Sequence, residues 1–284
     1  MAQKHSNISV GVDIGGTKIT AGLVADNKIT ATKTLPTPAG ENQQTVINAI
    51  IKACKEVLDV QSVSGIGVGV PGLVDTAEGI VYDASNIPSF KSVELKKILE
   101  QTFGKPVYVN NDANCFALGA KNIDEGKNYK NIVGLTLGTG LGGGIIINNH
   151  LYEGVGGGAG EFGYLPYRDG ILEHYCSGQF FKRKYDVTGE EAFALAQKGD
   201  SKAFRMFDVF GFHVGEAIKI AAHLLAPEAI MLGGSIAKSF DYFKESMWMS
   251  VRRFPYKNVV DNLEIIPVHN PGVAVIGAAS LVFD

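Results

Sequence analysis

Two glycine-rich turns, each between two apolar segments, open two similar halves of this chain. In the first half, Ile8–Ile14 leads through Gly15-Gly16 into Lys18–Ala25. Apolar, β-branched residues predict strands on both sides of this turn, with a third strand at 28–35. The elements expected after them are helices at 41–58, 93–102 and 112–121 and strands at 65–70 and 106–109. This order predicts a mixed sheet with helices on its faces.

The second half begins in the same way. Asn131–Leu137 and Gly143–Ile147 are apolar runs on either side of a Gly138–Gly140 turn, and a short strand follows at 150–152. The later elements expected are helices at 201–225, 240–251 and 273–281 and strands at 229–232 and 263–266. We therefore expect an α/β protein of two lobes with a central cleft, and a boundary near residues 110–120.

Glycine is over-represented, and its distribution indicates loops rather than a repeat. The 284 residues include 35 glycines, about 12% where about 7% is usual. Twelve of them lie between Gly138 and Gly170, and four lie between Gly65 and Gly72. Clustered glycine indicates places where the backbone must come close to something.

Charge and composition exclude several classes of protein. Lys and Arg number 26 against 29 Asp and Glu, so the chain lacks the basic surface of a nucleic-acid-binding protein. No apolar run reaches about 18 residues, and no signal-peptide core precedes the first strand, so no membrane segment is expected. Cys54, Cys115 and Cys176 lie far apart. They predict buried thiols in a reducing cytoplasm, not a disulfide framework or a cysteine-based zinc site.

The first motif with chemical content is Asp13-Ile14-Gly15-Gly16-Thr17-Lys18. Glycines let backbone N–H groups point at a phosphate, and Thr17 adds a hydroxyl. Asp13 could hold a magnesium ion, through water, because Mg²⁺ keeps several waters beside one or two carboxylates. The motif is neither a Walker A loop nor a dinucleotide-binding fingerprint. The alternative is a simple hairpin turn.

The second motif, Gly138-Thr139-Gly140-Leu141-Gly142-Gly143-Gly144, contains a literal GxGxxG. It leads into the strand residues Ile145–Ile147 rather than into a helix, which argues against dinucleotide binding. We interpret it as a second phosphate loop, with a tight hairpin as the alternative.

Three further motifs carry polar groups. Asp112 of Asn110-Asn111-Asp112 could accept a proton from a substrate hydroxyl while Asn111 bonds a neighbouring one, or the segment could only cap a helix. Glu161 and Glu173 lie in and after a glycine-rich loop and could accept hydrogen bonds from a sugar, or be exposed loop acids. Gly233-Gly234 could face a nucleotide, or precede a helix capped by Ser235.

In this order, the motifs resemble the ROK family of sugar kinases and repressors, within the actin–hexokinase–Hsp70 ATPase superfamily. The resemblance covers nearly the whole chain. The segments that carry it are 13–18, Gly69-Val70-Pro71-Gly72, Asn86, Asn111-Asp112, 138–144, Glu161-Phe162-Gly163, Leu172-Glu173 with Ser177-Gly178, Gly233-Gly234 and Gly277-Ala278-Ala279.

The resemblance implies two ribonuclease-H-like lobes, one at 1–115 completed by a C-terminal helix at 271–284, the other at 116–270. It implies transfer of the γ-phosphoryl group of ATP, with Mg²⁺, to a sugar hydroxyl. Asp112 would be the general base and Asp13 would serve the metal. The sugar would be held by Asn86, Asn111, Glu161 and Glu173, the phosphates by Gly15, Gly16, Thr17, Lys18, Gly138, Thr139 and Gly140, and the adenosine by Gly233 and Gly234.

The chain departs from the family at one place. Members typically carry Glu-x-Gly-His and then a CxCGxxGC stretch, whose three cysteines join that histidine on a structural zinc ion. Here Tyr164 stands at the histidine position, and 165–171 has no cysteine. No zinc site is therefore expected, and Tyr164 would offer the sugar a phenolic hydroxyl.

The family also contains repressors with an N-terminal helix-turn-helix. Seven residues precede the first strand here and the net charge is −3, so DNA binding is not expected. A sugar sensor without catalysis, or a kinase for another small metabolite, remains an alternative. Among sugars, an aldohexose such as glucose is favoured over N-acetylglucosamine, N-acetylmannosamine and fructose. The resemblance also implies a homodimer.

Overall fold

The computed structural model describes residues 7–58, 63–84 and 86–284. The chain forms two compact units. Unit 1 comprises Met1–Asn128, Gly144–Ala159 and Asn270–Asp284, and unit 2 comprises Tyr129–Gly143 and Gly160–His269. The C-terminal segment thus belongs to the same unit as the N-terminal strands. The expected lobes, 1–115 with 271–284 and 116–270, have other bounds than these two units and stay a prediction.

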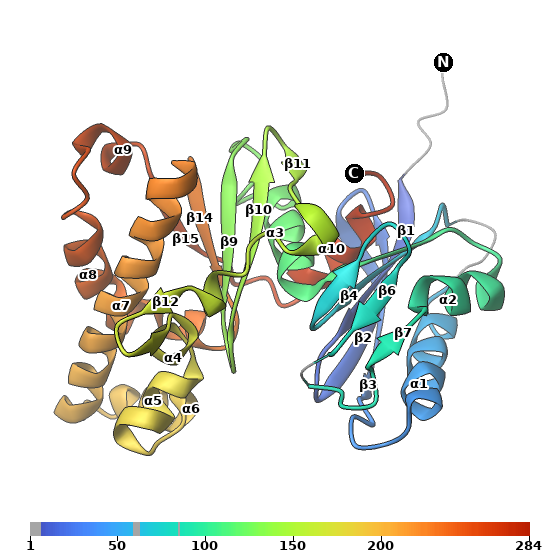
Figure 1. Cartoon of the computed structure of the whole chain (residues 1–284), viewed down its shortest axis with the longest axis horizontal. Coiled ribbons are helices and arrows are strands. Elements are labelled where there is room, and N and C mark those ends of the chain that lie inside the picture. The colour runs from blue at the N-terminus through green and yellow to red at the C-terminus, as the bar shows by residue number, and fades with distance from the viewer. Residues whose placement is uncertain (1–6, 59–62, 85) are drawn as a thin grey trace. The chain divides into compact units, whose positions relative to one another are not determined.

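A five-stranded mixed sheet forms the centre of unit 1 (Figure 1). Its order is β3-β2-β1-β4-β8, with β1, β2 and β3 in an antiparallel meander and β4 and β8 parallel to β1. The bounds are β1 Ile8–Ile14, β2 Lys18–Ala25, β3 Lys28–Pro36, β4 Ile66–Val70 and β8 Val107–Asn111. The expected mixed sheet is confirmed.

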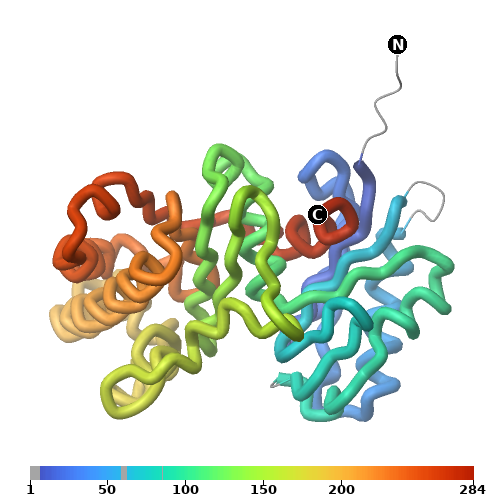
Figure 2. Tube along the Cα trace, turned by 45° about the horizontal axis from the view of Figure 1, so that its top comes forward, coloured from blue at the N-terminus to red at the C-terminus, as the bar shows by residue number. Residues whose placement is uncertain are grey.

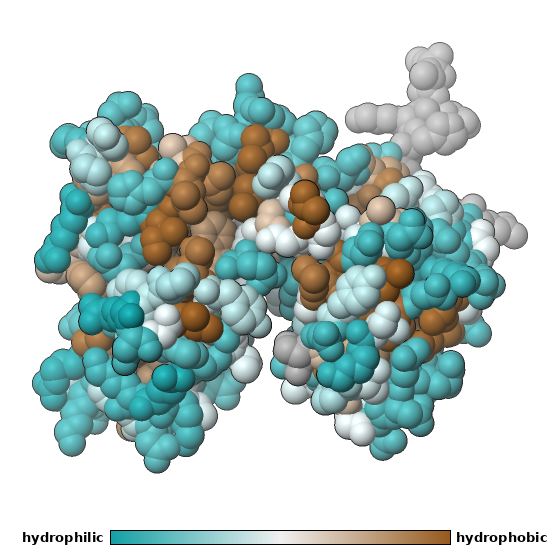
Figure 3. Space-filling view, viewed as in Figure 1, coloured by the Kyte–Doolittle hydropathy of each residue, from teal (hydrophilic) through white to brown (hydrophobic). Residues whose placement is uncertain are grey.

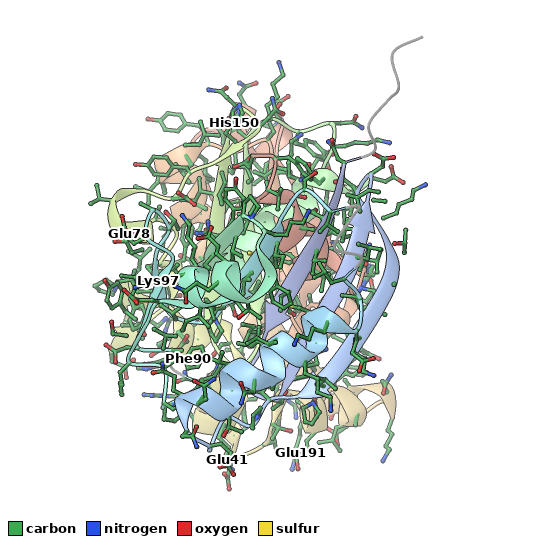
Figure 4. The ribbon with its side chains drawn as sticks, turned by 90° about the vertical axis from the view of Figure 1, so that its right-hand side faces the viewer. Glu41, Glu78, Phe90, Lys97, His150 and Glu191 are labelled. Carbon is green, nitrogen blue, oxygen red and sulfur yellow. The ribbon has the colours of Figure 1, made fainter. Side chains whose placement is uncertain are left out.

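Four helices accompany this sheet: α1 Gln43–Lys55, α2 Leu95–Phe103, α3 Asp112–Asn122 and α10 Val273–Ser280. Figure 4 shows α1 across the face of the first strands, and the labelled Phe90 is fully buried in the same core. Figure 2 shows the C-terminal segment, in red, beside the blue strands, where α10 packs on β1 and α3.

Several glycines make this close packing of α10 possible. A Cβ on Gly11 would lie 1.9 Å from the Val275 carbonyl oxygen, and one on Gly67 would lie 1.7 Å from that of Ala278. Where α10 meets α3, a Cβ on Gly277 would lie 1.7 Å from the Cys115 carbonyl oxygen. Part of the glycine excess therefore serves contacts between backbones rather than a ligand.

Unit 1 also contains a small sheet that the sequence analysis did not anticipate. Its order is β5-β6-β7, with bounds Leu73–Asp75, Ile80–Tyr82 and Ser92–Val93. Strands of two or three residues are too short to show an alternating pattern. This small sheet holds the turn between β4 and β5, which contains Gly72 with a φ of +106°.

In unit 2, three parallel strands lie side by side, with β14 Ala229–Gly233 between β9 Ile132–Leu137 and β15 Glu264–Pro267. Strand β10, Leu141–Ile147, begins in unit 2, and its last residues pair with β11, His150–Leu151, in unit 1. The long helices α7, Ser201–Leu225, and α8, Phe240–Val251, match the expected bounds and pack on each other. Figure 3 shows apolar side chains gathered over α7.

The remaining elements are short, and apart from the helix start expected after Ser235 they were not predicted from the sequence. Their bounds are η1 Val155–Gly157, η2 Phe162–Tyr164, β12 Pro166–Tyr167, β13 Gly170–Ile171, α4 Glu173–Cys176, α5 Gly178–Tyr185, α6 Gly189–Gln197, η3 Ile236–Ser239 and α9 Lys257–Asp261. The three cysteines are free and buried, as expected. Among the described residues, no helix has the length and apolar character needed to cross a membrane.

Candidate active site

The predicted residues of unit 1 gather at the carboxyl ends of its parallel strands. Asp13, near the end of β1, pairs with Gly69 of β4, and Gly69 pairs with Asn110 of β8. Asn111 ends β8 and Asp112 begins α3. In open α/β sheets, ligands bind beyond the carboxyl ends of the strands. The sheet therefore brings Asp13 and the Asn110–Asp112 segment to one edge.

The first glycine turn lies at this edge beside Asn86. The Gly15 amide donates to the Lys18 carbonyl oxygen at 2.8 Å, which closes the turn between β1 and β2. A Cβ on Gly16 would lie 2.8 Å from the Cβ of Asn86. The residues expected to hold phosphates and one residue expected to hold the sugar are therefore neighbours in unit 1, while Thr17 and Lys18 are exposed.

Asp13 has the environment of a carboxylate that would accept a cation. Desolvation raises the pKa of Asp13, and Lys18 acts in the opposite direction. A nearby divalent cation would stabilise the charged carboxylate. Among the described residues, no group of three or more His, Cys, Asp or Glu side chains could hold a metal ion. The donor set fits Mg²⁺, which binds through one or two carboxylates, water and substrate phosphates.

Asn111 caps α3, and this capping orients its side chain. Its Oδ1 accepts hydrogen bonds from the amides of Ala113 at 2.8 Å and Asn114 at 3.4 Å. Its Nδ2 donates to the Gly72 carbonyl oxygen at 3.0 Å. Asp112 follows as the first helical residue, with an oxygen 2.9 Å from the Ala113 amide nitrogen. The capping interpretation is thus confirmed for Asn111. The cap also fixes the backbone at the start of α3, where Asp112 is the first residue.

A buried polar network behind Asn111 was missing from the sequence analysis. Asn110, 2% exposed, donates to a carboxylate oxygen of Glu153 and accepts from the Asn111 amide at 2.8 Å. The Thr76 hydroxyl donates to the other Glu153 oxygen at 3.0 Å. Glu153 lies 43 residues from Asn110 in sequence, and nothing in its local pattern signals this contact. The network links the residue after β5, strand β8 and the loop before η1.

The region around this network is electronegative. Burial raises the pKa of Cys115 well above its usual value, and the nearby carboxylates of Asp13, Asp112 and Glu153 raise it further. Three acidic residues therefore lie close enough to one thiol to affect its ionisation. Such a concentration of negative charge favours a bound cation and a group that can take up a proton.

In unit 2, both predicted nucleotide segments follow neighbouring parallel strands. Gly138 follows β9, and Gly233 pairs with Thr136 at the end of β14. A Cβ on Gly234, whose φ is +85°, would lie 2.3 Å from the Leu137 carbonyl oxygen. The loop from Gly138 continues directly into β10, so the expected strand after the GxGxxG match is confirmed.

Gly138 and Thr139 of the first segment line a cavity of ≈ 590 Å³. Gly233 and Gly234 are not among its lining residues, but Ser235 and Ile236, which follow them, are. Its lining includes Gly138, Thr139, Gln179, Ser235 and Ile236, and also residues that the sequence analysis did not name, Lys182, Thr188, Glu190, Phe193 and Lys238. The alternative of a helix start capped by Ser235 is wrong in one respect, because its side chain makes no capping hydrogen bond to η3. The cavity is open to a ligand that reaches from the glycine loop toward α6.

Glu173 lies directly against the glycine loop. One carboxylate oxygen accepts from the Leu141 amide at 3.0 Å, and the other accepts from the Gln179 side chain at 2.7 Å. A Cβ on Gly140 would lie 2.5 Å from Glu173 Oε2, so a side chain there would displace this carboxylate. The carboxylate is held in place by two donors from different segments.

Glu161 lies near Glu173 within the same unit. Desolvation of its carboxyl group, followed by the negative charge of Glu173, raises the pKa of Glu161. The two acids are thus close enough to interact. Glu161 is exposed, as the alternative of exposed loop acids expects, whereas Glu173 is partly buried. Tyr164, in η2, is 71% exposed. A pair of acceptors of this kind suits a ligand rich in hydroxyl groups.

The family model "ROK family" matches residues 9–284. A glucokinase from Streptomyces coelicolor is 32% identical over 87% of this chain and 88% of its own. A glucokinase from Thermotoga maritima is 29% identical over 96% of each chain. A crystal structure of a ROK family glucokinase from Streptomyces griseus, in complex with glucose and AMPPNP, superposes with a TM-score of 0.81 at 29% identity, over 96% of this chain and 98% of that one.

Two further relatives bear on the alternatives. An N-acetyl-D-glucosamine kinase from Citrobacter koseri is 32% identical over 80% of this chain and 84% of its own. A xylose repressor from Bacillus subtilis is 29% identical over 78% of this chain but only 61% of its own length.

Proposed function

Since this chain belongs to the ROK family and is an ATP-dependent sugar phosphotransferase, we propose that it transfers the γ-phosphoryl group of ATP to a hydroxyl group of a glucose-type aldohexose. In this proposal Asp112 is the general base, and Mg²⁺ is the metal. The fold is that of the actin-like ATPases, as the sequence analysis expected.

The observation that supports this proposal best is the hydrogen bond from the Leu141 amide to Glu173. It joins the glycine loop expected to hold phosphates to a carboxylate expected to hold sugar hydroxyls. A kinase must keep both substrates within bonding reach, and fixed positions for both lower the barrier to reaction. A simple hairpin turn at 138–140 would have no need of a carboxylate against it.

The chemistry assigned to each group follows from phosphoryl transfer in general. Asp112 takes the proton of the attacking hydroxyl, whose oxygen bonds to the γ-phosphorus as the bond to the ADP oxygen breaks. Asp13 would hold Mg²⁺ through water, and this ion neutralises charge on the phosphates when bound. Asn111, with Asn86, orients the sugar from unit 1.

The remaining contacts are assigned by position and by the cavity in unit 2. Glu161 and Glu173 would accept hydrogen bonds from the other sugar hydroxyls, and the Tyr164 hydroxyl would donate or accept one. The phosphates would contact Gly15, Gly16, Thr17, Lys18, Gly138, Thr139 and Gly140. The adenosine would lie in the ≈ 590 Å³ cavity, where Phe193 and Ile236 offer apolar surface. Gly233 and Gly234 would flank it, since they directly precede the lining residues Ser235 and Ile236.

The sugar can be identified with a coupled ADP-release assay over a panel of glucose, mannose, fructose, N-acetylglucosamine and N-acetylmannosamine. We expect the highest kcat/KM with glucose. A higher value for an N-acetylhexosamine would replace the sugar and leave the kinase assignment intact. No ADP release with any member of the panel would contradict the proposed reaction.

A second candidate, a sugar-binding regulator, is favoured by the repressor among the relatives. The presence of Asp112 and of both glycine loops argues for catalysis. Sugar binding without ATP turnover would support the regulator instead.

We also propose that the protein is a cytoplasmic homodimer. Three free, buried cysteines suit a reducing compartment. The apolar side chains over α7 (Figure 3) suit an association surface. Sedimentation equilibrium would test this, and a monomer at all concentrations would contradict it.

A further inference from the structure

Glu173 lies in a helix that is too short to hold its own position. Helix α4 has four residues and follows β12 and β13, which have two residues each. Isolated helices shorter than ~12–15 residues are marginal in water. The placement of Glu173 must therefore depend on contacts between these small elements and a larger one.

That larger element is α7, the helix of 25 residues. The hydroxyl oxygen of Tyr167, in β12, lies 3.0 Å from Nδ1 of His213, in α7. Tyr175, in α4, packs edge-on against both rings, with centroids 5.2 Å from Tyr167 and 4.9 Å from His213. The hairpin and the helix that carries Glu173 thus contact the same imidazole.

His213 is suited to a fixed role in this contact. The residue is 4% exposed. Desolvation, and then the positive charges of Arg168 and Lys184, lower the pKa of His213 to about 4. Desolvation also raises the pKa of Tyr167, although Arg168 opposes it. At neutral pH a neutral imidazole can accept at Nδ1 from a protonated phenol, with its other nitrogen carrying the hydrogen.

We propose that the hydrogen bond between Tyr167 and His213 positions Glu173 for sugar binding. Both are positioning residues, since they act through β12, β13 and α4. The inference rests on the role proposed above for Glu173. Leu172 and Cys176, on either side of Glu173 in sequence, are fully buried and anchor α4 in the core of the unit. The hydrogen bond between Tyr167 and His213 then fixes the orientation of the segment from β12 to α4.

The test separates this hydrogen bond from the packing of the rings. Tyr167→Phe removes one hydroxyl and keeps the ring, so ring packing alone predicts no change in sugar binding. We expect the KM for the hexose chosen by the panel, D-glucose in the first instance, to rise about three- to tenfold. We expect kcat and the KM for ATP to stay within about twofold, because neither residue touches the reacting atoms.

Two variants of His213 provide the second arm. His213→Asn places an amide oxygen near the position of Nδ1 and can still accept from Tyr167. His213→Leu cannot accept. We expect the asparagine variant to keep a sugar KM close to that of the parent and the leucine variant to match Tyr167→Phe. Equal sugar KM values for the two His213 variants would overturn the inference.

A matched control and a reference variant make the outcomes distinguishable. Tyr185→Phe removes a hydroxyl from a tyrosine that packs on Phe180 in the same unit, and it should change nothing. Glu173→Gln should raise the sugar KM. If it does and Tyr167→Phe does not, only this inference fails. If Glu173→Gln leaves the sugar KM unchanged, the proposed role of Glu173 fails first.

Discussion

The amide of Leu141 donates a hydrogen bond of 3.0 Å to the carboxylate of Glu173, across 32 residues of sequence. The other carboxylate oxygen accepts from Gln179. Through this one side chain, the start of β10, helix α4 and helix α5 share a fixed geometry. A carboxylate held by two donors keeps its remaining lone pairs aimed at a ligand without a further loss of side-chain entropy.

Glu173→Gln should weaken sugar binding while it leaves the fold intact. A glutamine can accept from Leu141 or from Gln179, but its amide group meets a donor at the other position. We expect the KM for the sugar to rise about tenfold and the melting temperature to fall by a few degrees. Steady-state kinetics at saturating ATP checks this, and an unchanged KM would argue against sugar contact.

Asp13→Asn should lower ATP turnover and raise the melting temperature at neutral pH. Desolvation raises the pKa of Asp13 above 3.8, so the folded state penalises the charged form. The penalty is absent below pH 3.8 and fully present above the raised pKa. Without ligand, the variant should melt at a higher temperature than the parent at pH 7, and the difference should shrink as the pH falls. ATP turnover should drop at the same time. A lower melting temperature at pH 7 would count against this explanation.

His213 should make the protein acid-sensitive. Its pKa is lowered from 6.5 to about 4 in the folded state, with Arg168 and Lys184 adding to desolvation and Glu216 opposing them. Stability is therefore greatest above pH 6.5 and falls as the pH drops toward 4. Between pH 7.5 and pH 5 the loss should be about 2 kcal/mol. Urea unfolding at both pH values measures it, and His213→Asn should remove most of this difference.

Gly277→Ala should destabilise unit 1 strongly. The new Cβ would lie 1.7 Å from the Cys115 carbonyl oxygen, where α10 packs on α3. Because this oxygen belongs to the backbone, one of the two helices would have to shift. We expect a loss of about 3 kcal/mol or more. Gly40→Ala is the matched control, because nothing lies within 4 Å of its added Cβ. Similar unfolding midpoints for the two variants would show that the helices can move apart.

Long apolar segments with a clear period could be predicted from the sequence. Ile8–Ile14, Lys18–Ala25, Ser201–Leu225 and Phe240–Val251 have the expected bounds. The elements from 155 to 176 could not be predicted, because strands of two residues and helices of four carry no period. Helix α6 was missed although Thr188 and Glu191 form a capping box at its start. Their positions come from contacts such as Tyr167 with His213, which tertiary structure alone brings together.

The candidate site shows the same division. Motif residues such as Asp13 and Asn111 could be named because short-range chemistry marks them: a glycine turn and a helix cap. Glu153 could not, since its partners Asn110 and Thr76 are 43 and 77 residues away. The glycine excess was only partly a property of ligand loops, because Gly11, Gly67 and Gly277 serve helix α10.

If Asp112 takes the proton of the attacking hydroxyl, Asp112→Asn should abolish most of the turnover. The amide keeps the size of the side chain but cannot take that proton. With sugar and ATP at saturation, we expect kcat to fall at least ~10³-fold, with sugar binding retained. Turnover within about tenfold of the parent enzyme would show that Asp112 is not the general base.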